Sequence, residues 1–167
     1  VVLKNTDLMI LPGVGNFYFA MQHLKKTKMV KFIQDYSKNK PIIGICLGMQ
    51  IFFSKGSETK NSKGLNLITG EIKKFDNDGV KIGWDKCRNK SKLPSNFIDQ
   101  TEFFYFNHSF FASTKKRYIL SYSFYEKEKY PAIIKKNNLL GFQFHPEKSQ
   151  LNGKKLLKKA IILMLND

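Results

Sequence analysis

Cys46 follows the apolar run at residues 42–45 and has a glycine two positions away on either side, Gly44 and Gly48. At a predicted strand-to-helix junction this spacing is typical of a nucleophile elbow, because the tight turn leaves no room for neighbouring Cβ atoms. Such a turn places the thiol at the carboxyl edge of the sheet, where the dipole of the next helix lowers a thiol pKa. A buried structural cysteine would fit the same pentapeptide, which therefore leaves both interpretations open.

The segment Gly-Phe-Gln-Phe-His-Pro-Glu at residues 141–147 supplies a base for such a nucleophile. A cysteine hydrolase needs a general base that takes the thiol proton and later protonates the leaving group. His145 follows an apolar run that Pro146 ends, so we expect the imidazole at the same sheet edge as Cys46. Glu147 can reach the other ring nitrogen and hold the tautomer, as a triad carboxylate does. A histidine before proline is usually an ordinary loop residue, but its pairing with the elbow favours catalysis.

Pro12, Gly13, Val14 and Gly15 form a glycine-rich turn between a predicted strand and a predicted helix. Backbone N–H groups in such a turn can face a developing oxyanion, and the helix start adds its dipole. A phosphate-binding turn is the competing interpretation, but the pattern lacks both the Walker lysine and the G-x-G-x-x-G spacing. Together with the cysteine and the histidine, this loop completes the parts of an acyl-transfer site.

The elements around these residues predict a single α/β domain over residues 1–167. Apolar strands are expected at 8–11 and 42–45, with a helix between them from Asn16 to about Lys38. This arrangement is a βαβ unit, whose strands are parallel and buried. A second helix is expected to start within 47–53, and the polar segment 54–64 is expected to be a surface loop. The domain is therefore predicted to contain a mostly parallel central sheet.

An antiparallel β-rich region is expected to extend this sheet, because the middle of the chain is rich in β-branched and aromatic residues punctuated by Gly, Asn and Pro. The extended runs of this region are at residues 67–72, 80–84, 102–107, 118–124, 132–134 and 139–144. The chain ends with a predicted amphipathic helix at 151–165.

The composition excludes several classes of protein. A hydrophobic content of 42% argues against disorder, and no apolar run reaches the ~18 residues of a membrane span. The net charge of +16 comes from lysines spread along the chain, since only Arg88 and Arg117 are arginine. Nucleic-acid readout favours arginine forks and clustered stripes, so we expect no nucleic-acid partner and no membrane partner. We interpret the lysines as solvated surface residues, with attraction to anionic substrates or an acidic partner surface as the alternative. We expect the protein to be cytoplasmic.

The two cysteines, Cys46 and Cys87, do not form a disulfide framework in a chain without a secretory signal. Cys87 lies between Lys86 and Arg88 and has none of the features of the elbow. The three histidines show no zinc-ligand spacing to either cysteine, so we expect no metal and no cofactor.

These segments together resemble class I (triad-type) glutamine amidotransferases. Within that class they are most similar to the glutaminase subunits of imidazole glycerol phosphate synthases, which act in histidine biosynthesis. The likeness spans nearly the whole chain, and it implies a flavodoxin-like domain that hydrolyses glutamine to glutamate and ammonia. The matching segments are residues 11–17, 44–50, 83–84, 105–110 and 141–150.

The resemblance implies a nucleophile at Cys46, a base at His145 and its orienting group at Glu147. It implies a heterodimer in which a (β/α)₈ cyclase partner receives ammonia internally and docks near Trp84, Tyr105 and Lys148. It also implies that the loop 13–15 and several further residues surround the bound glutamine, whose ammonium needs an acceptor and whose carboxylate needs donors. Those further residues are Leu47, Gln50, Glu58, His108 and Ser109.

Two departures from the family leave alternatives open. The family opens with a βα unit carrying a glycine-rich turn, and about 30 residues of that kind are expected to be missing before the first strand found here. The family usually has Pro-His before Gly83-Trp84, where this chain has Lys81-Ile82. Specificity for the histidine pathway is therefore open, and a related glutaminase subunit that feeds a bacterial surface-sugar amidotransferase is one alternative. A stand-alone cysteine hydrolase and a basic nucleic-acid-binding or scaffold domain are the others.

Overall fold

The computed structural model describes residues 5–59, 62–90, 97–99 and 102–166. Its helices are α1 (Phe17–Lys26), α2 (Met29–Tyr36), α3 (Leu47–Gln50) and α4 (Gln150–Asn166), with short 3₁₀ turns η2 (Asp76–Asp78), η3 (Lys116–Tyr118) and η4 (Pro146–Lys148). Its strands are β1 (Met9–Leu11), β2 (Ile42–Ile45), β3 (Phe53–Gly56), β4 (Ser62–Lys63), β5 (Ile68–Lys74), β6 (Lys81–Lys86), β7 (Arg88–Asn89), β8 (Phe103–His108), β9 (Phe110–Thr114), β10 (Ile119–Tyr125), β11 (Glu128–Lys136) and β12 (Leu139–Phe142).

A six-stranded sheet in the order β1-β2-β12-β11-β10-β7 forms the centre of the molecule. Strands β1, β2 and β12 are parallel, whereas β11, β10 and β7 continue the sheet in antiparallel pairs. The predicted combination of a parallel βαβ unit with an added antiparallel region is confirmed. Because β2 and β12 are neighbours and run in the same direction, their carboxyl ends meet at one edge of the sheet.

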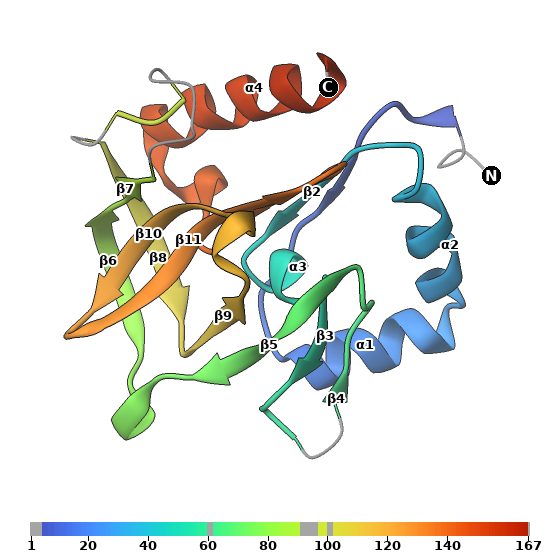
Figure 1. Cartoon of the computed structure of the whole chain (residues 1–167), viewed down its shortest axis with the longest axis horizontal. Coiled ribbons are helices and arrows are strands. Elements are labelled where there is room, and N and C mark those ends of the chain that lie inside the picture. Colours follow the sequence, from blue (N-terminus) through green and yellow to red (C-terminus); the bar gives the residue numbers. More distant parts are fainter. Residues whose placement is uncertain (1–4, 60–61, 91–96, 100–101, 167) are drawn as a thin grey trace.

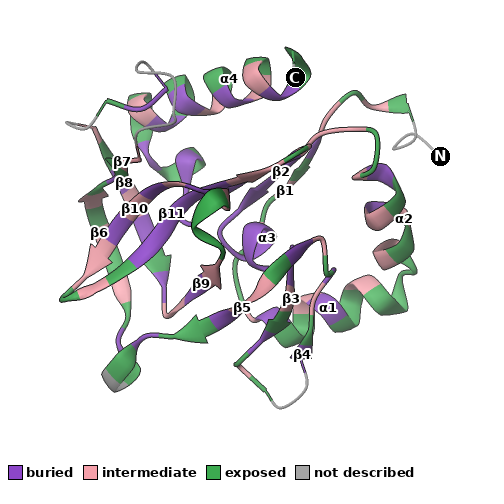
Figure 2. Cartoon of the chain, in the orientation of Figure 1, coloured by how far each residue is buried: buried purple, intermediate pink, exposed green. Residues whose placement is uncertain are grey.

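Helices cover both faces of the parallel strands, as Figure 1 shows for α4 on one side and α1 with α2 on the other. On β2, Ile43 and Ile45 belong to the hydrophobic cluster that includes α4, whereas Ile42 belongs to the cluster that includes α1 and α2. All four residues of β2 are therefore buried, which explains its uninterrupted apolar sequence (Figure 2).

Two smaller sheets pack beside the central one. The first has the order β4-β3-β5-β9, and the second pairs β6 with β8. The β6–β8 pair carries Trp84 opposite Tyr105. The six predicted extended runs all contain strands, although the bounds move by a few residues.

Three predicted elements differ from the structure. The single helix expected from Asn16 to about Lys38 is two helices, because Lys28 takes a left-handed φ of 58° and its N–H bonds to the carbonyl of Lys25, only three residues back. The helix expected within 47–53 ends at Gln50, and Phe53 already begins β3. The predicted surface loop 54–64 is wrong as well, since it contains β4 and most of β3.

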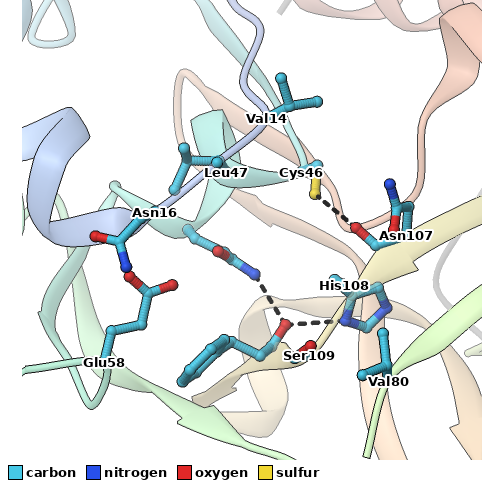
Figure 3. Close-up of a pocket in the computed structure, with 12 residues that line it drawn as sticks. Val14, Asn16, Cys46, Leu47, Glu58, Val80, Asn107, His108 and Ser109 are labelled. Carbon is cyan, nitrogen blue, oxygen red and sulfur yellow. Dashed lines mark hydrogen bonds between the residues drawn. The ribbon is translucent and has the colours of Figure 1, made fainter.

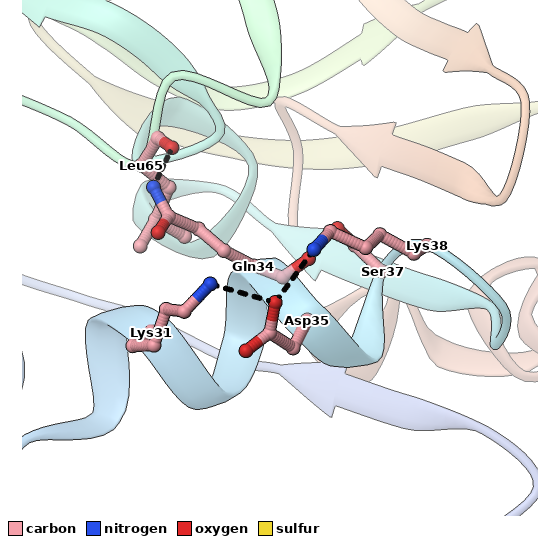
Figure 4. A network of polar contacts seen from close by, with 6 residues as sticks. All are labelled: Lys31, Gln34, Asp35, Ser37, Lys38 and Leu65. Atoms are coloured by element: carbon pink, nitrogen blue, oxygen red, sulfur yellow. Dashed lines mark hydrogen bonds and ion pairs between the residues drawn. The ribbon is translucent and has the colours of Figure 1, made fainter.

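Figure 4 shows polar contacts on the surface of α2 and one contact that joins α2 to the rest of the molecule. Asp35 accepts hydrogen bonds from Lys31 at 3.0 Å and Lys38 at 2.8 Å on the exposed face, and both lysines lower the pKa of its carboxyl. Gln34 reaches inward and donates to the carbonyl of Leu65 at 2.9 Å. Within the described part of the chain, no helix has both the length and the apolar character needed to cross a membrane.

Candidate active site

Cys46 occupies the sharp turn between β2 and α3. Its φ of 49° and ψ of −109° lie in a region that non-glycine residues rarely adopt. A Cβ on Gly48 would lie 1.8 Å from the carbonyl oxygen of Leu11, and one on Gly44 would lie 2.7 Å from the carbonyl oxygen of Gly48. The predicted geometry of a strained elbow flanked by obligatory glycines is therefore present.

This close packing leads to a stability prediction for Gly48→Ala. The new methyl group would overlap the rigid backbone of β1, so we expect the free energy of unfolding to fall by about 3 kcal/mol. Gly15→Ala is the comparison, because a Cβ there meets no atom within 4 Å and the substitution is strained only through its φ of 115°. Chemical denaturation of both variants would test this, and a smaller loss for Gly48→Ala than for Gly15→Ala would contradict it.

The thiol of Cys46 is buried. Its Sγ atom lies 3.9 Å from the carbonyl oxygen of Asn107 and 3.9 Å from Nε2 of Gln143. Burial raises the pKa of the Cys46 thiol to about 12, although the Leu47 N–H acts in the opposite direction. The expected lowering of this pKa by a helix dipole is wrong, because α3 has only four residues and desolvation outweighs its effect. The thiol therefore has to pass its proton to a base before it can attack.

His145 lies three residues after the end of β12, and the neighbouring strand β2 leads into the elbow. Its Nδ1 lies 2.7 Å from Oε1 of Glu147, as expected for an imidazole held by a carboxylate. Nε2 is buried and has no hydrogen-bond partner among the described residues. The backbone of His145 is held twice, since its N–H donates to the carbonyl of Tyr105 at 2.8 Å and its carbonyl accepts from the Ser149 hydroxyl at 2.6 Å. Nδ1 is thus occupied, and Nε2 is available for a proton transfer.

A cavity of about 350 Å³ opens over Cys46, and Figure 3 shows its lining side chains. It brings together residues from the loop before α1, the elbow, the segment after β3 and the β8–β9 turn. Every residue predicted to contact glutamine lies on it except Gly13, whose backbone packs against Leu47 and Gly48. The cavity is lined by Val14, Gly15, Asn16, Cys46, Leu47, Gln50, Glu58, Val80, Asn107, His108, Ser109 and Phe110.

Two polar side chains in the cavity are fixed by backbone groups. Nε2 of Gln50 donates to the carbonyl of Phe110 at 2.8 Å. Oε2 of Glu58 accepts the backbone N–H of Phe17 at 2.6 Å, at the start of α1. Partial burial raises the pKa of the Glu58 carboxyl, while its bonds to the N–H groups of Phe17 and Tyr18 act in the opposite direction. Glu58 therefore faces the cavity from a position that also holds the end of the glycine-rich loop.

His108 is neutral in this structure. Burial lowers the pKa of His108 to about 3, so the ring carries a single N–H. Nδ1 lies 2.9 Å from the carbonyl of Phe110, which can only accept, so the proton is on Nδ1. Nε2 is then an acceptor, and it has no partner within the described parts of the chain.

Trp84, Tyr105 and Lys148 form one surface group, here called the aromatic surface. The rings of Trp84 and Tyr105 meet edge to face with centroids 5.9 Å apart, and Nζ of Lys148 lies 6.0 Å from the centre of the Tyr105 ring. Trp84 is 46% exposed, which is high for a tryptophan held by a neighbour. Residues predicted to contact a partner are thus adjacent in space, although they come from separate parts of the chain.

Three further residues, for which the sequence patterns predicted no role, contact the thiol or hold His145: Asn107, Gln143 and Ser149. Gln143 and Ser149 have almost no exposed surface, and both make side-chain hydrogen bonds into this region. The sequence did contain a sign that Gln143 has a role, because this glutamine lies between two phenylalanines in an apolar run. Polar residues in such positions are buried only when they have partners.

The chain belongs to the class-I glutamine amidotransferase family, which its sequence matches over residues 2–164. It is 41% identical to "Imidazole glycerol phosphate synthase subunit HisH" of Carboxydothermus hydrogenoformans, over 91% of this chain and 78% of that protein. It is 34% identical to the protein of the same name from Thermotoga maritima, over 93% of this chain and 75% of that protein. Among solved structures, a glutamine amidotransferase matches 99% of this chain and 82% of its own length, with a TM-score of 0.74 and 12% sequence identity.

Proposed function

We propose that this chain is the glutaminase subunit of an imidazole glycerol phosphate synthase. One observation carries the proposal: an elbow cysteine directly follows β2, and a carboxylate-held histidine lies three residues after the adjacent parallel strand β12. Identities of 34–41% to proteins named as this subunit support the particular synthase. The subunit hydrolyses glutamine to glutamate and ammonia and passes the ammonia to a (β/α)₈ cyclase subunit.

In the proposed reaction, Nε2 of His145 takes the proton of the Cys46 thiol as Sγ attacks the side-chain amide carbon of glutamine. The carbonyl π electrons move to oxygen, and the oxyanion is stabilised by N–H groups of Leu47 and of the loop 13–15. Protonated His145 then gives its proton to the amide nitrogen, the C–N bond breaks, and ammonia leaves a thioester on Cys46. Water, deprotonated by His145, attacks the thioester carbon, and glutamate leaves as the thiol re-forms.

The raised pKa of Cys46 has a role in this scheme. A thiol that remains protonated in the empty site is less exposed to oxidation and alkylation. Proton transfer to His145 creates an ion pair that Glu147 stabilises through Nδ1. Attack therefore requires a bound substrate, because the negative charge then moves from sulfur to the oxygen of the substrate carbonyl.

The cavity offers groups that suit a zwitterionic amino acid. The carboxylate of Glu58 and the side-chain oxygen of Gln50 are acceptors for the α-ammonium group, while the Ser109 region supplies donors. The proposed reaction uses side chains and backbone groups of this chain. The site is proposed to work in a cytoplasmic heterodimer, with the aromatic surface of Trp84, Tyr105 and Lys148 against the cyclase.

Glu147→Gln tests how Glu147 acts. The amide can donate to Nδ1 and so favour the wrong tautomer, and it leaves protonated His145 without a counter-charge. We expect kcat to fall by about 100-fold while the Michaelis constant for glutamine changes little, and His145→Ala to lose more. Steady-state kinetics of glutamate release would measure both. Normal turnover by a folded Glu147→Gln variant would mean that another group orients His145.

The proposed function can be tested in cells that lack their own glutaminase subunit and need histidine. Expression of this chain should restore growth without histidine, whereas Cys46→Ala should not.

A purified-protein assay should show hydrolysis of glutamine in preference to peptides and esters. Stimulation by a surface-sugar amidotransferase, without rescue of growth, would assign the subunit to that pathway. Salt-dependent binding of DNA or RNA that survives Cys46→Ala, without any glutaminase activity, would replace the enzyme by a binding module.

A further inference from the structure

A line of amides connects a backbone carbonyl to the proposed nucleophile. Nε2 of Gln50 lies 2.8 Å from the carbonyl oxygen of Phe110 and 3.4 Å from Oε1 of Gln143. Nε2 of Gln143 lies 3.9 Å from Sγ of Cys46. Gln143 is fully buried, and Gln50 is only 4% exposed. The proposed reaction uses Gln50 to bind glutamine and makes no use of Gln143.

The direction of this line is determined by chemistry. The carbonyl of Phe110 can only accept, so the Gln50 amide has to present N–H to it; the opposite orientation would place two oxygens 2.8 Å apart. The second N–H of Gln50 then faces Gln143, which must present its oxygen. That leaves the N–H groups of Gln143 facing the sulfur. Each amide orientation therefore follows from the one before it.

A donor directed at sulfur distinguishes the two protonation states of Cys46. The neutral thiol can donate its proton to the carbonyl of Asn107, which lies 3.9 Å from Sγ. The thiolate cannot donate, and it is the stronger acceptor for the Gln143 N–H. The hydrogen bond from Gln143 lowers the pKa of the Cys46 thiol, against the larger opposite effect of burial.

We propose that Gln143 is a catalytic residue, which donates an N–H to the Cys46 sulfur and stabilises the thiolate when His145 takes its proton. This inference deepens the proposed glutaminase function and rests on Cys46 being its nucleophile. Gln50 is the positioning residue for Gln143, because the Phe110 carbonyl fixes its amide. Gln50 also lines the cavity, so a substrate that contacts it acts on the same line of amides that reaches the nucleophile.

The test compares Gln143→Met with Gln143→Glu in the complete chain. Methionine keeps the length and removes the donor, so the rate of Cys46 alkylation by iodoacetamide at neutral pH should fall about tenfold, or one pKa unit. Glutamate keeps the shape and loses the donor only when its carboxyl ionises. The ratio of its alkylation rate to that of wild type, measured at the same pH, should therefore be close to one at low pH. This ratio should fall as the introduced carboxyl ionises. Alkylation is read at the Cys46 peptide by mass spectrometry.

Gln34→Met is the matched control, because it removes a similar amide-to-carbonyl hydrogen bond on α2, outside the cavity. It should leave Cys46 alkylation unchanged. A role in packing alone would not give the Gln143→Glu variant a rate loss that depends on ionisation. Unchanged alkylation in Gln143→Glu across the carboxyl titration would overturn the proposal, even if Gln143→Met fails to fold.

Activity gives a second readout that separates this inference from the proposed function. If wild type hydrolyses glutamine, Gln143→Met should lower kcat about tenfold with little change in the Michaelis constant. If wild type has no glutaminase activity even with the cyclase subunit, but the alkylation results hold, the proposed function fails and the contact between Gln143 and the thiolate stands. If wild type is active and both Gln143 variants alkylate as wild type does, the inference about Gln143 fails alone.

Discussion

Cys46→Ala is expected to lower glutamine hydrolysis by on the order of 10⁴-fold or more, because removal of the nucleophile removes the covalent route. Cys46→Ser should be nearly as severe, since a serine hydroxyl is a much weaker nucleophile in a site arranged for sulfur. Both side chains are close to cysteine in size, so the strained turn between β2 and α3 should persist and the unfolding midpoint should change little. Glutamate release and circular dichroism would measure the two effects separately.

Cys87→Ala is the control for the Cys46 variants. Cys87 is fully buried in the cluster next to α4 and does not line the cavity. Its replacement should cost some stability through the lost sulfur volume but leave kcat unchanged. A diazo-ketone analogue of glutamine should label Cys46 and spare Cys87, which mass spectrometry can check. Equal loss of activity in a folded Cys87→Ala variant would contradict the assignment of the nucleophile.

The residues that carry the proposed chemistry were predictable because short local patterns encode them. Gly48 has to be glycine because a methyl group there would lie 1.8 Å from a backbone oxygen of β1. The placement of His145 followed from the apolar run before it, although β12 already ends at Phe142. Parallel strands then bring their carboxyl ends to one edge, so two distant motifs meet without any contact prediction.

Other features depended on tertiary contacts that no local pattern records. The segment 54–64 is polar, yet Lys55 lies opposite Glu71 and Gly56 opposite Ile72, so β3 forms through pairing with β5, which lies outside the segment. The pKa of Cys46 was misjudged because the pentapeptide shows a helix start but not the four-residue length of α3 or the burial of sulfur. Gln143 was overlooked because its partners, Gln50 and Cys46, lie far away in the sequence.

A glutaminase that feeds a synthase is expected to be slow when alone. Ammonia released at neutral pH is mostly protonated and is then no nucleophile, so early hydrolysis wastes glutamine. The loop before α1 can act as the brake: Gly15 has a φ of 115°, a Cβ there meets nothing within 4 Å, and Val14 is 70% exposed. The peptide between these residues can therefore present either a carbonyl or an N–H to the cavity, and partner docking can select the N–H form.

Addition of the cyclase subunit with its acceptor substrate is thus expected to raise glutamine hydrolysis by about 100-fold or more, where each tenfold is about 1.4 kcal/mol of transition-state stabilisation. Trp84→Ala and Lys148→Ala should weaken this stimulation more than they lower the basal rate, because Tyr105 joins the aromatic surface to the backbone of His145. Lys154→Ala, an exposed lysine on α4, is the matched control. Glutamate release would be measured with and without the partner. A subunit that already turned over at its maximal rate alone, and that no synthase subunit accelerated, would be a stand-alone glutaminase.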